Sequence, residues 1–226
     1  MSKSFPKHLE LLIENIAEIE RLLRIQNGVT GGITRRQYNV ETLNASCIVL
    51  LVACWESYVE DVVNAAFDIL LDNAYNPLKF PVDVRLLASK ELKESKDERK
   101  VWNLAGDGWR KVLVNYKNEQ IKSFNTPKPE NIDRLCKRLI DIQKISREFR
   151  VPRMKNSDVC EQLDALIKLR GSIAHRVKAN KPVTKKTVEQ HIRLIGVLAE
   201  NMNNIINDQI KELTGSEPWG HIQVAI

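Results

Sequence analysis

An arginine and a histidine stand five positions apart in the stretch LRGSIAHR, Leu169 to Arg176. The Arg170 guanidinium can bind a phosphate through two parallel hydrogen bonds, and the His175 imidazole can gain or lose a proton near neutral pH. RNA cleavage without a metal requires both abilities. An arbitrary pair with this spacing more often has a structural role, in which the histidine caps helix carbonyls and the arginine pairs with a carboxylate. The setting of the pair is therefore what favours one role over the other.

The backbone between the two residues determines whether their side chains can meet. Five residues of ideal helix turn through about 500°, which would leave Arg170 and His175 about 140° apart around the axis. Gly171 is a poor helix-interior residue and can bend or end the helix, so that both side chains line one cleft. Alternatively the helix continues to Ala174, and His175 lies at its C-terminal end, where the helix dipole favours imidazolium.

The surrounding chain is strongly basic. Between Arg134 and Lys186 there are 15 Lys or Arg against 5 Asp or Glu, a local charge of +10, whereas the whole chain carries +6 and the remainder therefore −4. Such clustering is typical of a phosphate-binding surface, although solvated helix faces also carry lysines. Lys168, Arg176 and Lys178 are the candidate RNA-binding residues closest to the pair.

Helical periodicity predicts the elements that must position these residues. We expect a first helix over Leu9–Leu23 that ends at Asn27-Gly28, and a long buried helix over Val40–Leu71. Further helices are predicted over Asn131–Ser146, from a cap at Ser157 or Asp158 up to Arg170, and from Thr184 past Leu213. These patterns predict an all-α, up-and-down helical bundle that forms one domain over residues 1–226.

The middle third of the chain is weakly patterned. The stretch VDVRLLASKELKESKDERKVW predicts one charged, exposed helix, GDGW predicts a turn, and RKVLVNYKNEQI fits either a helix or a strand. We therefore expect an inserted, partly irregular segment over approximately 77–130. Trp102, Trp109 and Tyr116 in this segment either stack on bases or, as such aromatics more often do, pin the segment to the bundle.

Other features of the sequence argue against several classes of protein. The longest apolar stretch, CIVLLVACW, is half the length of a membrane span, and the N-terminal residues lack the pattern of a signal peptide, so we expect a cytosolic protein without a membrane partner. The four cysteines, Cys47, Cys54, Cys136 and Cys160, have neither a CxxC spacing nor a zinc spacing and are expected to be structural thiols. No metal site and no cofactor site are expected.

Two stretches resemble a known family. Arg170-Gly-Ser-Ile-Ala-His175 is similar to the R-x4-6-H motif of HEPN domains, and CWESYVEDVV, Cys54 to Val63, is similar to the Trp-Glu helix of the RiboL-PSP type of HEPN protein. The resemblance implies a HEPN-like helical bundle and a metal-independent endoribonuclease that acts as a toxin or phage-defence effector. In the family the position after the arginine is usually polar; here it is Gly171, and Ser172 is the nearest polar substitute.

The resemblance also implies partners for the catalytic pair Arg170 and His175. A homodimer would bring two copies of the motif into one cleft, and apolar residues over Leu163–Ile173 and along the last helix favour a two-fold interface there. Glu56 and Glu60 share a helical face, and either one of them orients the motif or both are ordinary exposed acids. The expected partners are RNA, a second copy, and a cognate antitoxin or defence-system protein. Two alternatives stay open: a non-catalytic HEPN-like interaction module, and a nucleotide-binding module that uses Arg170.

Overall fold

The computed structural model describes residues 5–28, 33–176 and 182–223 of the chain. Every regular element in these residues is helical, which confirms the all-α prediction. The α-helices are α1 (Lys7–Gly28), α2 (Ile33–Asn73), α3 (Val82–Ala88), α4 (Lys90–Glu94), α5 (Gly108–Ser123), α6 (Pro129–Ile140), α7 (Asn156–Arg176) and α8 (Lys185–Thr214). Short 3-10 turns lie at η1 (Pro77–Lys79), η2 (Glu98–Leu104) and η3 (Ile145–Glu148).

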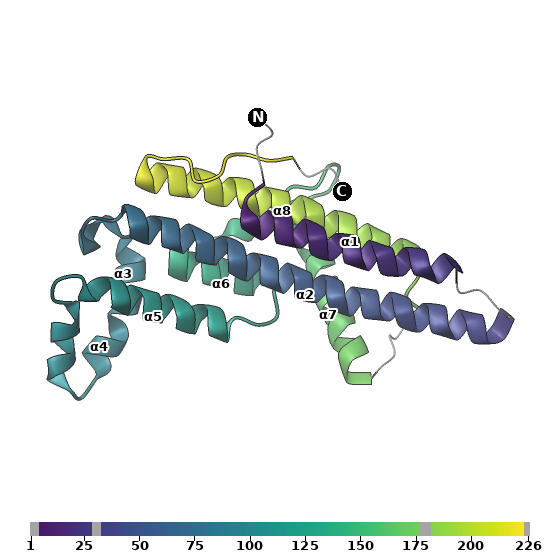
Figure 1. The fold of residues 1–226 in the computed structure, drawn as a ribbon, viewed down its shortest axis with the longest axis horizontal. Helices are drawn as coiled ribbons and strands as arrows, with labels where there is room; N and C mark the ends of the chain where they lie inside the picture. The colour runs from purple at the N-terminus through teal and green to yellow at the C-terminus, as the bar shows by residue number, and fades with distance from the viewer. Residues whose placement is uncertain (1–4, 29–32, 177–181, 224–226) are drawn as a thin grey trace.

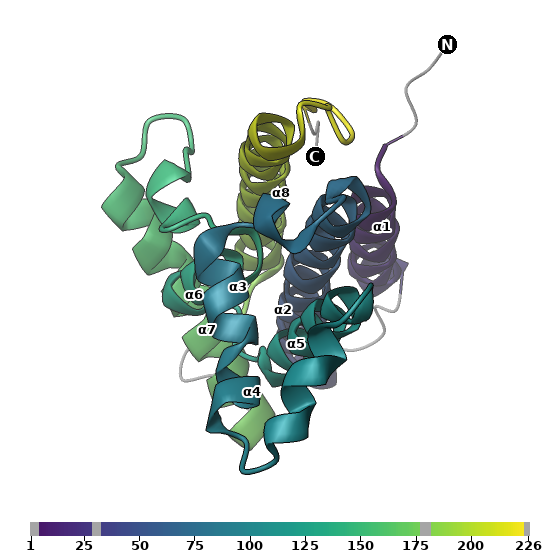
Figure 2. The same ribbon diagram turned by 90° about the vertical axis from the view of Figure 1, so that its left-hand side faces the viewer.

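Helix α2 is the centre of the bundle. Figure 1 shows α1 and α8 running along it on one side, while α5 and α7 lie on the other side, and the end-on view in Figure 2 shows the same division. Leu51, Trp55, Val59 and Val62 of α2 are all buried. A helix with apolar residues on most of its sides needs neighbours all round, and this is why the other long helices gather on α2.

By length and composition alone, Val40–Asn73 could also cross a membrane. The same test is met by the core helix of a globular bundle. In this fold Ile48, Val63 and Phe67 are fully buried among neighbouring helices, as expected of a core helix.

The ends of the long helices follow local sequence signals. The predicted start of the last helix at Thr184 is confirmed, because the Thr184 hydroxyl accepts a hydrogen bond from the Thr187 amide at 3.1 Å. The same helix ends at Gly215, whose φ of 76° lies in the left-handed region that favours glycine. Helix α2 begins at Ile33, seven residues before the predicted start at Val40.

The middle segment differs from its prediction in one respect. The stretch expected to form one exposed helix is instead divided into α3, α4 and η2. Asp97 starts the last of these pieces, since its carboxylate accepts from the Arg99 amide at 3.2 Å and so competes with a continuous helix. The stretch that fitted either helix or strand forms helix α5. The boundaries of the insert, approximately 77–130, stay a prediction.

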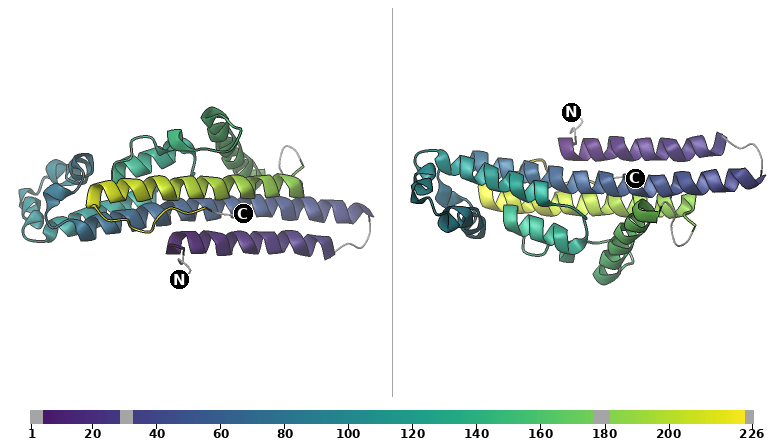
Figure 3. Two further views of the ribbon diagram at one scale, coloured as in Figure 1. Left: turned by 90° about the horizontal axis from the view of Figure 1, so that it is seen from above. Right: turned by 90° about the horizontal axis from the view of Figure 1, so that it is seen from below.

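Helix α7 leaves the direction of the bundle. Helix α6 ends at Ile140, before the predicted Ser146, because Asp141 adopts a left-handed conformation with φ 59°. Helix α7 then starts at Asn156, ahead of the predicted cap, and the Asn156 side-chain amide donates to the Ser146 carbonyl at 2.8 Å. From there α7 crosses the long helices obliquely (Figure 3), and its C-terminal end projects past α2 on the side away from α8 (Figure 1).

Candidate functional site

The arginine–histidine motif lies on one unbroken helix. Helix α7 runs from Asn156 to Arg176 without interruption at Gly171, so the helix does not end at this glycine and the alternative of a continuing helix is correct. A Cβ atom added at Gly171 would meet no atom within 4 Å. The helix surface at this position is therefore open, and no close packing requires a glycine there.

Arg170 continues the buried face of α7. Val159, Leu163 and Leu166 precede it at spacings of four, three and four residues, and all three are buried. Arg170 itself is partly buried, and its Nε atom is buried without a hydrogen-bond partner among the described residues. An arginine has five N–H donors and no acceptor, so the Nε–H of Arg170 is a buried donor without an acceptor in this structure.

His175 lies on a different face of the helix. Five residues of regular helix separate it from Arg170 by about 140° around the axis, and the His175 side chain is exposed. Lys168 is also exposed and lies two turns before His175, on the same face. Within one chain, α7 thus presents Arg170 inward and the Lys168–His175 face outward.

Helix α2 places a carboxylate opposite Arg170. Burial raises the pKa of Glu56 above its ordinary value, and the positive charge of Arg170 opposes that rise. The pKa of Glu60 is raised by burial and by the negative charges of Glu56 and Asp61. Of the two predicted supporting acids, Glu56 is therefore the one whose pKa is affected by the charge of Arg170.

The remaining predicted site residues have different surroundings. The Ser172 hydroxyl donates to the Leu169 carbonyl of its own helix at 2.8 Å, so its proton is already used there. Arg176 is the last residue of α7, and its side chain lies outside the described part of the structure, as does the whole of Lys178.

The apolar residues that favoured a two-fold interface are packed inside the single chain. Leu163, Leu166, Ile167 and Ile173 are buried within the single chain, and so are the apolar residues along α8 such as Ile195. These side chains are therefore not exposed for contact with a second copy. A homodimer stays a prediction, but it needs another argument.

The other histidines are held by structural contacts. His8 is buried, its Nε2 lies 3.0 Å from Asn203 Oδ1, and its ring meets Trp219 edge-on at 4.8 Å. His191 donates from Nδ1 to the Thr187 carbonyl at 2.7 Å, as expected for a histidine satisfied within the bundle. His221 pairs with Asp208 at 2.6 Å on the surface.

The aromatic residues of the middle segment separate into two groups. Trp109 is buried and pins α5 to the fold, and Tyr116 is partly buried. Trp102 is 76% exposed and therefore does not hold the segment against the bundle. It belongs to a set of exposed large hydrophobic residues in this segment: Leu78, Val82, Leu86, Val101, Trp102 and Leu104.

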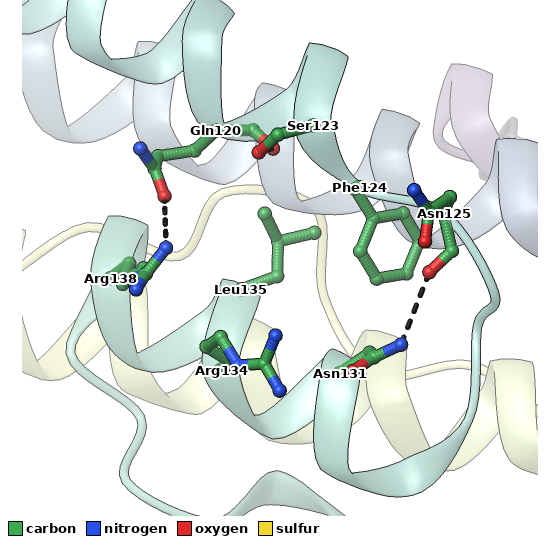
Figure 4. A pocket seen from close by; sticks show the side chains of 8 residues that line it. All are labelled: Gln120, Ser123, Phe124, Asn125, Asn131, Arg134, Leu135 and Arg138. Carbon is green, nitrogen blue, oxygen red and sulfur yellow. Dashed lines mark hydrogen bonds between the residues drawn. The ribbon is translucent and has the colours of Figure 1, made fainter.

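A polar pocket that the sequence did not predict lies between α5 and α6 (Figure 4). Its volume is about 70 Å³, and Arg134 and Arg138 of α6 line it together with Gln120 and Ser123 of α5. Figure 4 shows Arg138 opposite Gln120, to which its Nη1 donates at 2.8 Å. The four-residue spacing of the arginines places them on one face of α6, but the facing residues of α5 come from tertiary packing.

Within the described residues, no group of three or more His, Cys, Asp or Glu side chains is arranged to hold a metal ion. Cys47, Cys54, Cys136 and Cys160 are all free thiols, and burial raises the pKa of each. The thiols therefore resist ionisation at neutral pH, as expected of structural cysteines.

Comparison with known proteins identifies the family. Searches of curated proteins and of solved structures find no match. The model of the RiboL-PSP-HEPN family matches residues 10–208, a region that includes α2 and α7 entirely. This region is most of the chain and contains both stretches that resembled HEPN proteins, and the protein therefore belongs to this family of HEPN domains.

Proposed function

We propose that the protein is a metal-independent endoribonuclease that cleaves RNA by attack of the ribose 2′-hydroxyl. The observation that carries this proposal is the guanidinium of Arg170, which ends the buried face of α7 with an unpartnered donor. Membership of the RiboL-PSP-HEPN family supports the same chemistry, since many HEPN domains are ribonucleases.

The chemistry assigns one role to each residue of the motif. A neutral His175 imidazole accepts the proton of the 2′-hydroxyl, and the 2′-oxygen then forms a bond to the adjacent phosphorus. Arg170 stabilises the additional negative charge on the phosphate oxygens. The bond to the 5′-oxygen breaks, and an imidazolium returns a proton to this leaving group. The products are a 2′,3′-cyclic phosphate and a 5′-hydroxyl.

Two copies of the chain form the active site in this proposal. Arg170 and His175 diverge by about 140° on one continuous helix, so a single motif does not direct both side chains at one phosphate. A two-fold axis beside the projecting end of α7 would bring Arg170 of one protomer near His175 of its partner. In each such site the His175 of one protomer would act first as general base and then, as imidazolium, as general acid.

The biological setting follows from the family resemblance. The proposed enzyme is a cytoplasmic toxin or phage-defence effector, held in check by a cognate antitoxin or a defence-system partner. The basic surface around α7, with Lys168 exposed on it, supports binding to RNA.

The experiment that tests this function is an RNA cleavage assay with and without EDTA. The parent protein should cut mixed RNA, spare DNA, keep its activity in EDTA and leave 2′,3′-cyclic phosphate ends. His175→Ala should lower the rate by roughly 10² to 10⁴, the usual contribution of general acid–base catalysis. His221→Ala is the matched control, because His221 is also exposed but pairs with Asp208 away from the motif. Loss of activity in EDTA, or an unimpaired His175→Ala protein, would contradict the mechanism.

A second candidate is a non-catalytic HEPN-like module that binds a partner or a nucleotide. Gly171 at a usually polar position and the divergence of Arg170 from His175 both favour it. It predicts no RNA cleavage by the pure protein. A nucleotide-binding module would also bind a mononucleotide through Arg170 and lose that binding in Arg170→Ala.

A further inference from the structure

The α5–α6 pocket has the side chains of an oxyanion site. Arg134 is exposed at its mouth, and Arg138 is partly buried, with one of its five N–H donors used by Gln120. The Asn131 amide holds the turn at one edge by donating to the Thr126 carbonyl at 2.8 Å. The pocket volume of about 70 Å³ exceeds the about 10–15 Å³ that a cavity needs to hold one water. A group larger than water therefore fits between the two helices.

The neighbouring acids are already engaged by other groups. Glu130, one turn before Arg134, binds Lys128 with its Oε2 3.0 Å from Nζ. The hydrogen bond from Lys128 lowers the pKa of Glu130, and the charge of Arg134 lowers it further. Asp133 accepts from both the amide and the hydroxyl of Ser146 at 2.8 Å. The two arginines of the pocket thus keep capacity to bind an anion.

The Tyr116 hydroxyl is close to Arg138 but does not line the pocket. The Tyr116 Oη atom is buried and has no hydrogen-bond partner within the described ranges. Tyr116 lies one turn before Gln120 on α5, and the charge of Arg138 opposes the rise that burial causes in the Tyr116 pKa. An oxyanion, with several lone pairs, is the class of ligand that can accept from the N–H donors of Arg134 and Arg138 at once.

The pocket lies on the same side of α2 as the projecting end of α7. Figures 1 and 2 show α5 and α7 on one side of α2 and α1 on the other. Two consecutive residues of α2 interact with groups near the pocket and near the motif. Trp55 donates to the Pro127 carbonyl at 3.1 Å, two residues after the pocket residue Asn125, and burial raises the pKa of Glu56 while the charge of Arg170 lowers it. A single strand that crosses this side of the protein can therefore contact the pocket and the motif together.

We propose that the α5–α6 pocket, through Arg134 and Arg138, binds a backbone phosphate of the RNA strand and so sets the path of that strand toward the α7 motif. This inference rests on the proposed ribonuclease function. It adds a subsite that positions the substrate but takes no part in the chemical step.

Binding of a 2′-O-methyl oligonucleotide tests the subsite separately from cleavage, because a strand without free 2′-hydroxyls cannot react by the proposed route. Fluorescence anisotropy should show that Arg134→Gln raises the Kd for this strand about tenfold, as expected for loss of a charged hydrogen bond. The slope of log Kd against log salt should fall by about 0.7. Arg24→Gln is the matched control: Arg24 is an exposed arginine on α1, across α2 from the pocket, and its loss should change Kd by less than about twofold.

Each outcome decides between the two proposals. Equal Kd values for Arg134→Gln and Arg24→Gln, or no binding of the strand by the parent protein, would overturn the subsite even if RNA is cut normally. If Arg134→Gln weakens binding of the strand but the parent protein cuts no RNA, the subsite stands and the proposed ribonuclease function is overturned. Tighter binding of AMP than of the strand, lost in Arg134→Gln, would overturn the RNA subsite in favour of a mononucleotide site. Arg138→Lys, which keeps the charge but loses the planar fork, should bind more weakly than the parent.

Discussion

If the active site is shared between two protomers, two inactive variants should restore activity when they are combined. Arg170→Ala and His175→Ala each remove one half of every composite site, so each pure protein should lose nearly all cleavage. Unfolding and refolding an equal mixture gives a statistical distribution in which about half of the dimers are heterodimers. In each heterodimer, one of the two sites takes an intact Arg170 from one chain and an intact His175 from the other. The mixture should therefore recover about a quarter of the parent activity.

The assay is initial-rate cleavage of a fluorescent RNA by the refolded mixture at constant total protein. The magnitude depends on the unbroken course of α7, which holds the two side chains on faces about 140° apart in a single chain. An inactive mixture that light scattering shows to contain dimers would refute the composite site. A parent protein that cuts RNA as a monomer would refute it as well.

Three changes test the account of the fold by thermal unfolding. Gly171→Ala should stabilise by about 0.5–1 kcal/mol, because the added methyl meets no atom within 4 Å and the helix is continuous; unchanged or lower Tm would contradict this. Tyr58→Phe removes the hydrogen bond from the buried hydroxyl to the Ala199 carbonyl, 2.7 Å long, and should cost about 1 kcal/mol, or about 2–4 °C in Tm. Glu60→Gln should stabilise by about 0.2–0.5 kcal/mol at neutral pH by removing repulsion with Glu56. The folded state raises the Glu60 pKa, so this gain should vanish at about pH 3, where the carboxyl is protonated in both states; a gain that persists there would exclude charge as its cause.

Local sequence signals predicted most of the helices. The periodic apolar residues of α1, α2, α7 and α8 each follow a helical stripe, and Thr184 supplied a cap that the structure uses. The middle segment was predicted less well, because the breaks on either side of α4 depend on short polar contacts such as that of Asp97 with Arg99. Those contacts compete with helix propensity by small amounts, which periodicity does not measure.

The candidate site was predictable only in part. The sequence indicated Arg170 and His175 by residue type and spacing, but it left open whether the helix ends at Gly171 or continues. Packing against α2 supplies the answer, since a continuous buried stripe through Leu163 and Leu166 keeps α7 helical beyond Arg170. Membership of the RiboL-PSP-HEPN family agrees with the resemblance seen in two short stretches, Cys54 to Val63 and Arg170 to His175. The family match extends this resemblance over residues 10–208.

The sequence by itself determined the class of the fold and the residue types of the motif, because hydrophobic periodicity and residue type are properties of short segments. Only the tertiary structure decided which acid faces Arg170, and that Arg134 and Arg138 share a pocket with Gln120. Both arrangements join residues from separate helices, and their geometry depends on how the apolar faces of those helices pack. Such packing is a property of the whole chain, and no local pattern records it.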